Sequence, residues 1–339
     1  MKRFWGLGIG FLMVLWVAAG AMADEILFPW VVKSPTISTI ISVVNTDEDG
    51  NHKKLHFLYR YKKGGDCEST CEHADFYVPT SPNDVLVFDA AGNINYGRPL
   101  FGDSVLLGKY PYPIRTLRNI PCPTRAFLIV ENEGADDTLY GEAMLVELAT
   151  GAAWGYAAYN PNGEGDFTRD RFGEVLAPNE AAKMVIMPID RFTTRVFVTP
   201  VDNLTAMKDD DLEVEVGFYY KDGDEFLSGF YGRDEDSYSL GGPQSVVCTG
   251  VFDVADYVTE IFKDVLSVDA GGGEGWAYVR VTSHACVGKL EFNVGSTKLD
   301  GTTIPGSTNN FIWLRGTPTD VPVLQPSQPS VPPGCCCPN

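Results

Sequence analysis

The feature that most limits how this chain can fold is a set of short segments in which every second residue is apolar. The segment 212–220 alternates apolar with mostly polar residues, and the segment 55–61 does the same with one exception at Leu58. Successive side chains of a β-strand point to opposite faces of its sheet, so this period predicts strands with one buried face and one wet face. Clusters of Gly, Pro, Asn and Asp separate such segments, as is typical of antiparallel sandwiches.

Five sequence landmarks occur twice in the same order, which indicates an internal duplication. The pairs are 39–45 with 194–203, 55–61 with 212–220, 87–89 with 251–253, 125–130 with 275–281, and 140–148 with 287–294. Short apolar motifs recur by chance in β proteins, so no single pair is strong evidence. Their common order favours two related antiparallel β-sandwich domains in tandem, and the expected fold class is all-β.

The duplication divides the chain into four parts. We expect a signal peptide at 1–23, a first sandwich at 24–188, a second sandwich at 189–315 and a disordered proline-rich tail at 316–339. The tail is expected to be extended because its prolines cannot pack into a core. The segment 254–265 has apolar residues at helical spacing, which predicts one short helix in the second domain with Asp253 as its cap.

The N-terminus has the layout of a cleaved secretory signal. Lys2 and Arg3 precede an apolar run at 4–17, and small residues follow at 21–23. A membrane anchor is the alternative, but the run is short for a span and ends in a small-residue site. We expect export to the periplasm, the cell surface or the exterior, and a mature chain that begins at Asp24 without a transmembrane segment.

The excess of acidic residues limits which partners the chain can bind. The chain has 45 acidic and 26 basic residues and a formal net charge of −19. Nucleic acid is therefore not expected as a partner, because phosphate binding needs a basic field. We expect envelope or surface components as partners, or self-association through the tail cysteines.

Eight cysteines in an exported chain favour disulfides over a metal or redox site. Cys248 and Cys286 are the only body cysteines of the second domain, so we expect them to pair. In the first domain we expect Cys122 to pair with either Cys67 or Cys71.

Two other cysteine arrangements stay open. The two neighbouring cysteines of the first domain stand close to His73, but their spacing lacks the second pair of a usual zinc site. The C-terminal run of Cys335, Cys336 and Cys337 can form intermolecular disulfides, tether the chain to an envelope component, capture a soft metal ion, pair with the odd body cysteine, or have no role.

Trp154, Tyr156 and Tyr159 form a candidate ligand platform. Trp154 and Tyr156 share one face of a predicted strand, and Tyr159 follows it. Such a row of rings can stack on sugars. The preferred alternative is a strand whose aromatic rings fill a sandwich core.

Acidic turns supply weak calcium candidates. Asn45, Asp47, Asp49 and Gly50 reproduce the opening spacing of a calcium loop, but its twelfth position is His56, where a bidentate glutamate belongs. Asp222 and Asp224 flank a glycine in another turn. Solvated turns explain these residues more simply, so we expect no cofactor, with Ca²⁺ as the one weak candidate.

The search for catalytic motifs favours a non-enzymatic protein. The sequence has no Gly-x-Ser-x-Gly elbow, His-Glu-x-x-His motif, phosphate loop or dinucleotide fingerprint. The leading hypothesis is an exported cell-envelope or surface protein with a structural or binding role, tethered or cross-linked through its cysteine tail. The alternative is a secreted glycan-binding module or glycan-active enzyme that uses the aromatic platform and acidic loops.

Overall fold

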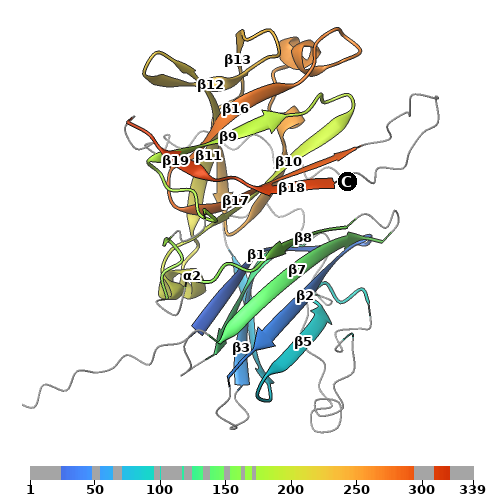
Figure 1. Ribbon diagram of the computed structural model, residues 1–339, viewed down its shortest axis with the longest axis vertical. Helices are drawn as coiled ribbons and strands as arrows, with labels where there is room; N and C mark the ends of the chain where they lie inside the picture. The colour runs from blue at the N-terminus through green and yellow to red at the C-terminus, as the bar shows by residue number, and fades with distance from the viewer. Residues whose placement is uncertain are drawn as a thin grey trace, which may run out of the picture.

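The computed structural model confirms the all-β class (Figure 1). The structure describes residues 24–47, 54–63, 71–94, 100, 117, 124–132, 138–148, 153–161, 165–169, 173–293 and 309–320. Within these ranges strands predominate, and every strand pairing is antiparallel.

The first sandwich consists of two four-stranded sheets. One sheet has the order β1 (Asp24–Lys33), β6 (Thr124–Asn132), β3 (Lys54–Lys63) and β4 (Glu72–Pro79). The other has the order β5 (Asp84–Asp89), β2 (Ile37–Asn45), β7 (Leu139–Glu147) and β8 (Ala153–Ala157). The inner faces bury residues of the duplicated landmark segments, such as Ile41, Phe57 and Phe88.

The second sandwich has a smaller and a larger sheet. The smaller sheet has the order β15 (Gly250–Asp253), β10 (Phe192–Pro200), β17 (Ala285–Asn293) and β18 (Asn309–Trp313). The larger sheet has the order β13 (Ser237–Ser239), β12 (Glu225–Tyr231), β11 (Glu213–Asp222), β16 (Gly275–Val281), β9 (Glu180–Ile186) and β19 (Gly316–Pro318), and β14 (Gln244–Val247) also pairs with β11. Its core includes Val216, Phe230 and Val279.

The two sandwiches repeat the same strand order, as the duplicated landmarks predict. The order β5-β2-β7-β8 in the first sandwich corresponds to β15-β10-β17-β18 in the second. The order β4-β3-β6-β1 likewise corresponds to β12-β11-β16-β9. Each of the five duplicated landmarks lies on a pair of strands that hold equivalent positions.

This correspondence moves the expected domain limits. The strand β9 lies before the expected boundary at residue 188, yet it pairs with β16 and is the counterpart of β1. The expected tail starts at residue 316, yet β19 pairs with β9 in the second sandwich. The first sandwich has a matching feature, because Tyr159 forms a bridge with Leu27 of β1. The second repeat therefore begins near residue 180 and extends through Pro318.

The helical segments differ in place and type from the expected helix. The α-helix α2 (Leu204–Asp209) follows β10, and the Asn203 side chain accepts a hydrogen bond from the Ala206 N–H at 3.1 Å. The segment expected to be helical forms two 3₁₀ turns, η3 (Val254–Asp256) and η4 (Glu260–Leu266). Asp253 makes no side-chain capping bond, because its carboxylate binds the Arg195 guanidinium at 2.7 and 2.9 Å.

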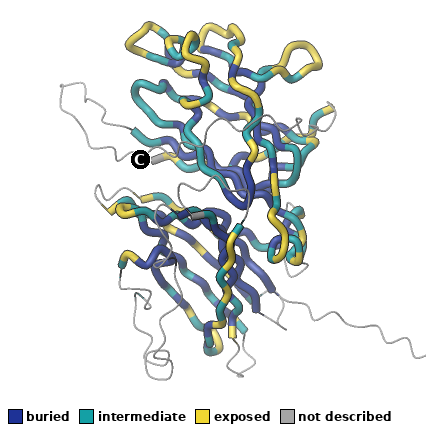
Figure 2. The backbone as a smooth tube through the Cα atoms, turned by 180° about the vertical axis from the view of Figure 1, so that it is seen from behind, coloured by how far each residue is buried: buried dark blue, intermediate teal, exposed yellow. Residues whose placement is uncertain are grey.

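The smaller sheet of the second domain packs on both of its faces. Val196 and Val198 of β10 face the second sandwich core, whereas Phe197 packs against Trp30 and Trp154 of the first domain. Buried residues of both domains therefore form one cluster where the two sandwiches meet (Figure 2). We call this contact region, which includes Trp30 and Trp154 of the first domain and Phe197 and Phe311 of the second, the junction.

Candidate functional site

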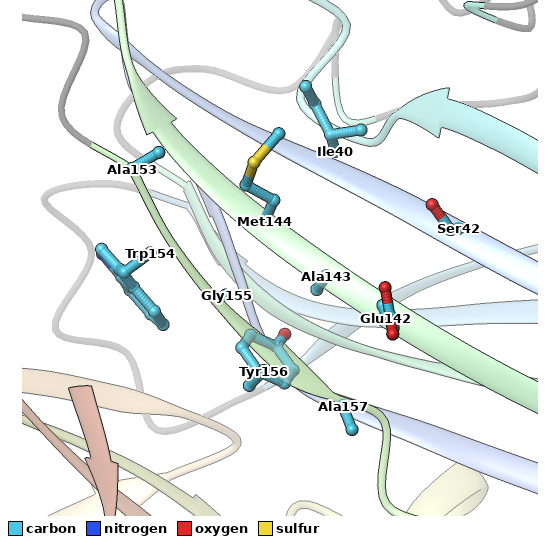
Figure 3. A pocket seen from close by; sticks show the side chains of 10 residues that line it. All are labelled: Ile40, Ser42, Glu142, Ala143, Met144, Ala153, Trp154, Gly155, Tyr156 and Ala157. Atoms are coloured by element: carbon cyan, nitrogen blue, oxygen red, sulfur yellow. The ribbon is translucent and has the colours of Figure 1, made fainter.

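The predicted aromatic platform lies inside the junction. Figure 3 shows Trp154 and Tyr156 pointing away from Met144, toward strands of the second domain. Tyr156 is 6% exposed and Tyr159 is 2% exposed. The Trp154 ring stacks on Phe311 of β18 with centroids 4.5 Å apart. Trp154 itself is half-buried, and its stacking on Phe311 occupies one ring face, so the three rings do not form an open platform for a sugar.

Trp30 lies at the centre of the junction. Its ring contacts Tyr156 at 5.2 Å, Phe311 at 5.3 Å and Trp313 at 4.5 Å between centroids. A Cβ atom built on Gly288 of β17 would lie 2.7 Å from the Trp30 ring, so a residue without a side chain lets the ring approach the strand. The Tyr156 hydroxyl donates to the Trp30 carbonyl oxygen at 2.5 Å, which fixes the two residues together.

The opposite face of β8 borders a shallow, open groove of about 600 Å³. Its lining includes Ile40, Ser42, Glu142 and Met144 on neighbouring strands (Figure 3). The one carboxylate of this lining, Glu142, accepts a hydrogen bond from the Tyr140 hydroxyl at 2.6 Å, and that bond raises the pKa of Tyr140. The groove thus offers small and apolar side chains and a single acidic group.

The disulfide pairing differs from the expected one. Cys71 of the first domain is bonded to Cys248 of the second, across 177 residues of sequence. The expected Cys248–Cys286 bridge is therefore wrong, and Cys286 is buried in β17. Bonding of Cys71 to Cys122, or to a metal together with His73, is also wrong because the Cys71 sulfur is occupied.

Cys67, Cys122, Cys335, Cys336 and Cys337 lie outside the described residues. Cys248 itself occupies a corner between β14 and β15, with a backbone φ of 68°. Its N–H donates to the Leu212 carbonyl oxygen at 2.9 Å, which helps to hold this left-handed conformation.

A row of titratable residues crosses the β1-β6-β3-β4 sheet. Strand register places Glu25 opposite Glu131, Glu131 opposite His56, and His56 opposite Tyr77. The His56 Nδ1 lies 2.8 Å from a Glu131 carboxylate oxygen, and its ring stacks on Tyr77 with centroids 4.6 Å apart. These side chains share one face because residues directly opposite in antiparallel strands point the same way.

The second domain covers this row with α2. Lys208 binds a Glu131 carboxylate oxygen at 2.6 Å. Arg60, which is 4% exposed, donates to the carbonyl oxygens of Lys208 and Asp210 at 2.8 Å each and pairs with Asp211 at 3.0 Å. These charged contacts add directional hydrogen bonds to the apolar junction, which fixes how the domains are oriented.

The pKa values of two carboxyl groups in the row are shifted in opposite directions. Burial raises the pKa of Glu25 to about 7, although the Gly165 N–H that donates to it acts the other way. Burial also acts to raise the pKa of Glu131, but hydrogen bonds from His56 and Lys208 outweigh it and hold that pKa below its usual range. The other charged groups that act on the pKa of Glu25 are Asp24 and Glu131, which raise it, and Lys208, which lowers it.

Replacing Glu25 with glutamine is expected to stabilise the protein at alkaline pH. The native state binds the Glu25 proton more tightly than the unfolded chain, so this group's stabilisation is complete below its ordinary pKa of 4.5 and is lost as pH rises through about 7. Glutamine stays neutral, so E25Q should exceed the parent by on the order of 3 kcal/mol at pH 8 and match it at pH 4. Chemical denaturation at several pH values measures this difference.

The Glu25 experiment needs two precautions. The chain should retain residues before Asp24, because a free α-amino group there would add a positive charge beside Glu25. Glu142→Gln serves as the control, since Glu142 is an exposed carboxylate of the groove. Parallel stability profiles of E25Q and the parent from pH 4 to pH 8 would contradict the assigned burial effect.

The calcium candidates do not converge. Asp47 is half-buried, and Asp49 lies outside the described residues. Asp222 and Asp224 are exposed on either side of Gly223, which has a φ of 60°, in the tight turn between β11 and β12. In the part of the chain that the structure describes, no three or more His, Cys, Asp or Glu side chains are grouped to hold a metal ion.

The structure also reveals an aromatic surface that the sequence patterns did not single out. Tyr231, Trp276, Tyr278 and Phe226, here called the aromatic ladder, are half-buried on the larger sheet of the second sandwich. Consecutive members have ring centroids 4.5, 5.1 and 5.2 Å apart. Core residues Ala277 and Val279 alternate with Trp276 and Tyr278, so the ladder lies on the outer face. The alternation of small or aliphatic residues with aromatic residues in 275–281 is the sequence signal that indicates this surface.

Comparison with protein-family models, with curated proteins and with solved structures finds no match. Among the described residues, no helix has the length and apolar character needed to cross a membrane.

Proposed function

We propose that this chain is an exported, non-enzymatic protein of the cell envelope or surface, in which two sandwiches form one rigid unit with a structural or binding role. The Cys71–Cys248 disulfide carries the proposal, because it joins the two domains. Disulfides of this kind persist in oxidising compartments and are rare in the reducing cytosol. The buried junction around Trp30 adds support, since a large apolar contact opposes independent domain motion.

Thiol labelling after cell fractionation tests the compartment. We expect the protein in an extracytoplasmic fraction, with Cys71 and Cys248 protected from alkylation until a reductant is added. The same chain without residues 1–23 should stay in the cytosol and lose this protection. Recovery of the complete chain from the cytosol with both thiols alkylated would contradict the proposal.

The proposed role of the tail needs its own experiment. A truncation after Asp320 keeps β19 in its sheet, whereas a cut at residue 316 would remove a paired strand. We expect disulfide-linked species on non-reducing gels to disappear in this truncation and in a full-length variant with serine at Cys335, Cys336 and Cys337. If oligomers and cell-surface retention persist in both, tethering through the tail is wrong.

The alternative role in glycan binding loses its original site. Tyr156 and Tyr159 are buried, and the half-buried Trp154 ring is stacked on Phe311, so the three rings do not form an open platform. Any glycan-binding role must use another surface of the protein.

A further inference from the structure

The aromatic ladder presents its rings in a fixed arrangement. The Tyr231 hydroxyl accepts from the Lys221 N–H at 2.9 Å and donates to the Lys221 carbonyl oxygen at 2.6 Å. At the other end, the Arg280 guanidinium lies 4.6 Å from the Phe226 ring centroid. Side chains that are already ordered lose little entropy when a ligand binds, which favours recognition by such a surface.

Positively charged groups border the ladder. Lys183 of β9 lies opposite Tyr278, and Lys221 of β11 lies opposite Phe226. Both lysines are exposed, and neither forms an ion pair with a residue that the structure describes. The two ammonium groups therefore lie on either side of the rings, while Asp222, Asp224 and Glu225 occupy the turn that adjoins Lys221.

We propose that the aromatic ladder binds an acidic oligosaccharide, whose sugar rings stack on Trp276 and Tyr278 and whose carboxylates pair with Lys183 and Lys221. A sugar ring presents an apolar C–H face and a polar rim, and a half-buried aromatic ring beside an exposed ammonium group complements both. The negatively charged carboxylates of the ligand complement the positively charged ammonium groups of the two lysines. This site is independent of the disulfide and the junction, so its test is separate from that of the proposed function.

Two other occupants fit the observations less well. A nucleic acid also offers rings and negative charge, but its phosphate backbone needs a continuous basic field, whereas the ladder is bordered by two exposed lysines next to an acidic turn. A flat protein partner would bury the unpaired ammonium groups, which requires matching carboxylates on the partner. An oligosaccharide chain follows a narrow row of rings and leaves the lysine side chains partly hydrated.

Calorimetric titration of the complete chain tests the proposal with three uronate oligomers, namely oligogalacturonate, oligomannuronate and oligoglucuronate. Methyl-esterified oligogalacturonate keeps the rings and removes the charge. We expect at least one uronate to bind, the ester to bind more weakly than its acid, and the affinity to fall as salt is raised. Trp276→Ala should weaken binding by about tenfold or more, and Lys183→Gln by about two- to fivefold at low salt.

Matched variants separate loss of binding from loss of fold. Tyr140→Ala removes an exposed ring on the first sandwich, and Lys54→Gln removes an exposed lysine, so both should bind as the parent does. Lys183→Gln keeps the test decisive if Trp276→Ala unfolds the protein. The proposal is overturned if no uronate binds at millimolar concentration, or if Lys183→Gln leaves uronate binding unchanged. Tighter binding of single-stranded oligothymidylate than of any uronate, or dimerisation that requires Trp276, would also overturn it.

Discussion

Replacing Cys71 and Cys248 together with serine is expected to lower the free energy of unfolding by about 2–5 kcal/mol. The bond spans 177 residues, so its loss frees a very long stretch of the unfolded chain. In the chain-entropy account a closed loop of this length restricts the unfolded state by about 5 kcal/mol. Urea denaturation of the oxidised parent and of the double variant measures the difference.

A reductant supplies the control for the disulfide prediction. The oxidised parent should lose stability when reduced and should then approach the double variant. The double variant should respond less to the same treatment, because the bond between the domains is already absent. Equal stability of the oxidised parent and the variant would contradict the assigned role of the bond.

Replacing Trp30 with alanine is expected to lower the free energy of unfolding by about 3–5 kcal/mol. The Trp30 side chain is 1% exposed and contacts rings of both domains, so its removal leaves a cavity where the sandwiches meet. Denaturation followed by tryptophan fluorescence measures the effect, since Trp154 and Trp313 lie in the same region.

Two further variants separate packing from general damage at this position. Trp30→Phe keeps an aromatic ring and should lose less stability than Trp30→Ala. Gly288→Val adds atoms where a Cβ would already lie 2.7 Å from the Trp30 ring, so overpacking should destabilise it by about 1–3 kcal/mol. A loss below about 1 kcal/mol for Trp30→Ala would show that the ring is not essential to the junction.

The period-two pattern predicted the fold class and the duplication because most strands have one core face. The strand β11 shows this clearly, since Val214, Val216 and Phe218 are buried in the core. The same reasoning missed β1, because almost all residues of Asp24–Lys33 are buried and no alternation is left to read. Its counterpart β9 does alternate in burial, so these two strands share no common sequence pattern, and the start of the second repeat near residue 180 follows only from the pairing of β9 with β16.

The candidate sites were harder to predict because they depend on how the domains dock. Alternation correctly grouped Trp154 with Tyr156 on one face, but it cannot reveal that another domain covers that face. Cysteine pairing has the same limit, because Cys71 and Cys248 come together only once both sandwiches are in place. The ladder residues Trp276 and Tyr278 follow the same pattern on a face that stays open.

The contact between β8 and β18 joins equivalent edge strands of the two repeats, with the Trp154 ring stacked on Phe311. Two separate sandwiches with these surfaces would meet only as often as their concentration allowed. Covalent linkage within one polypeptide makes the encounter intramolecular, so its effective concentration does not fall when the protein is diluted. The paired arrangement can therefore persist at a dilution that would separate two free subunits.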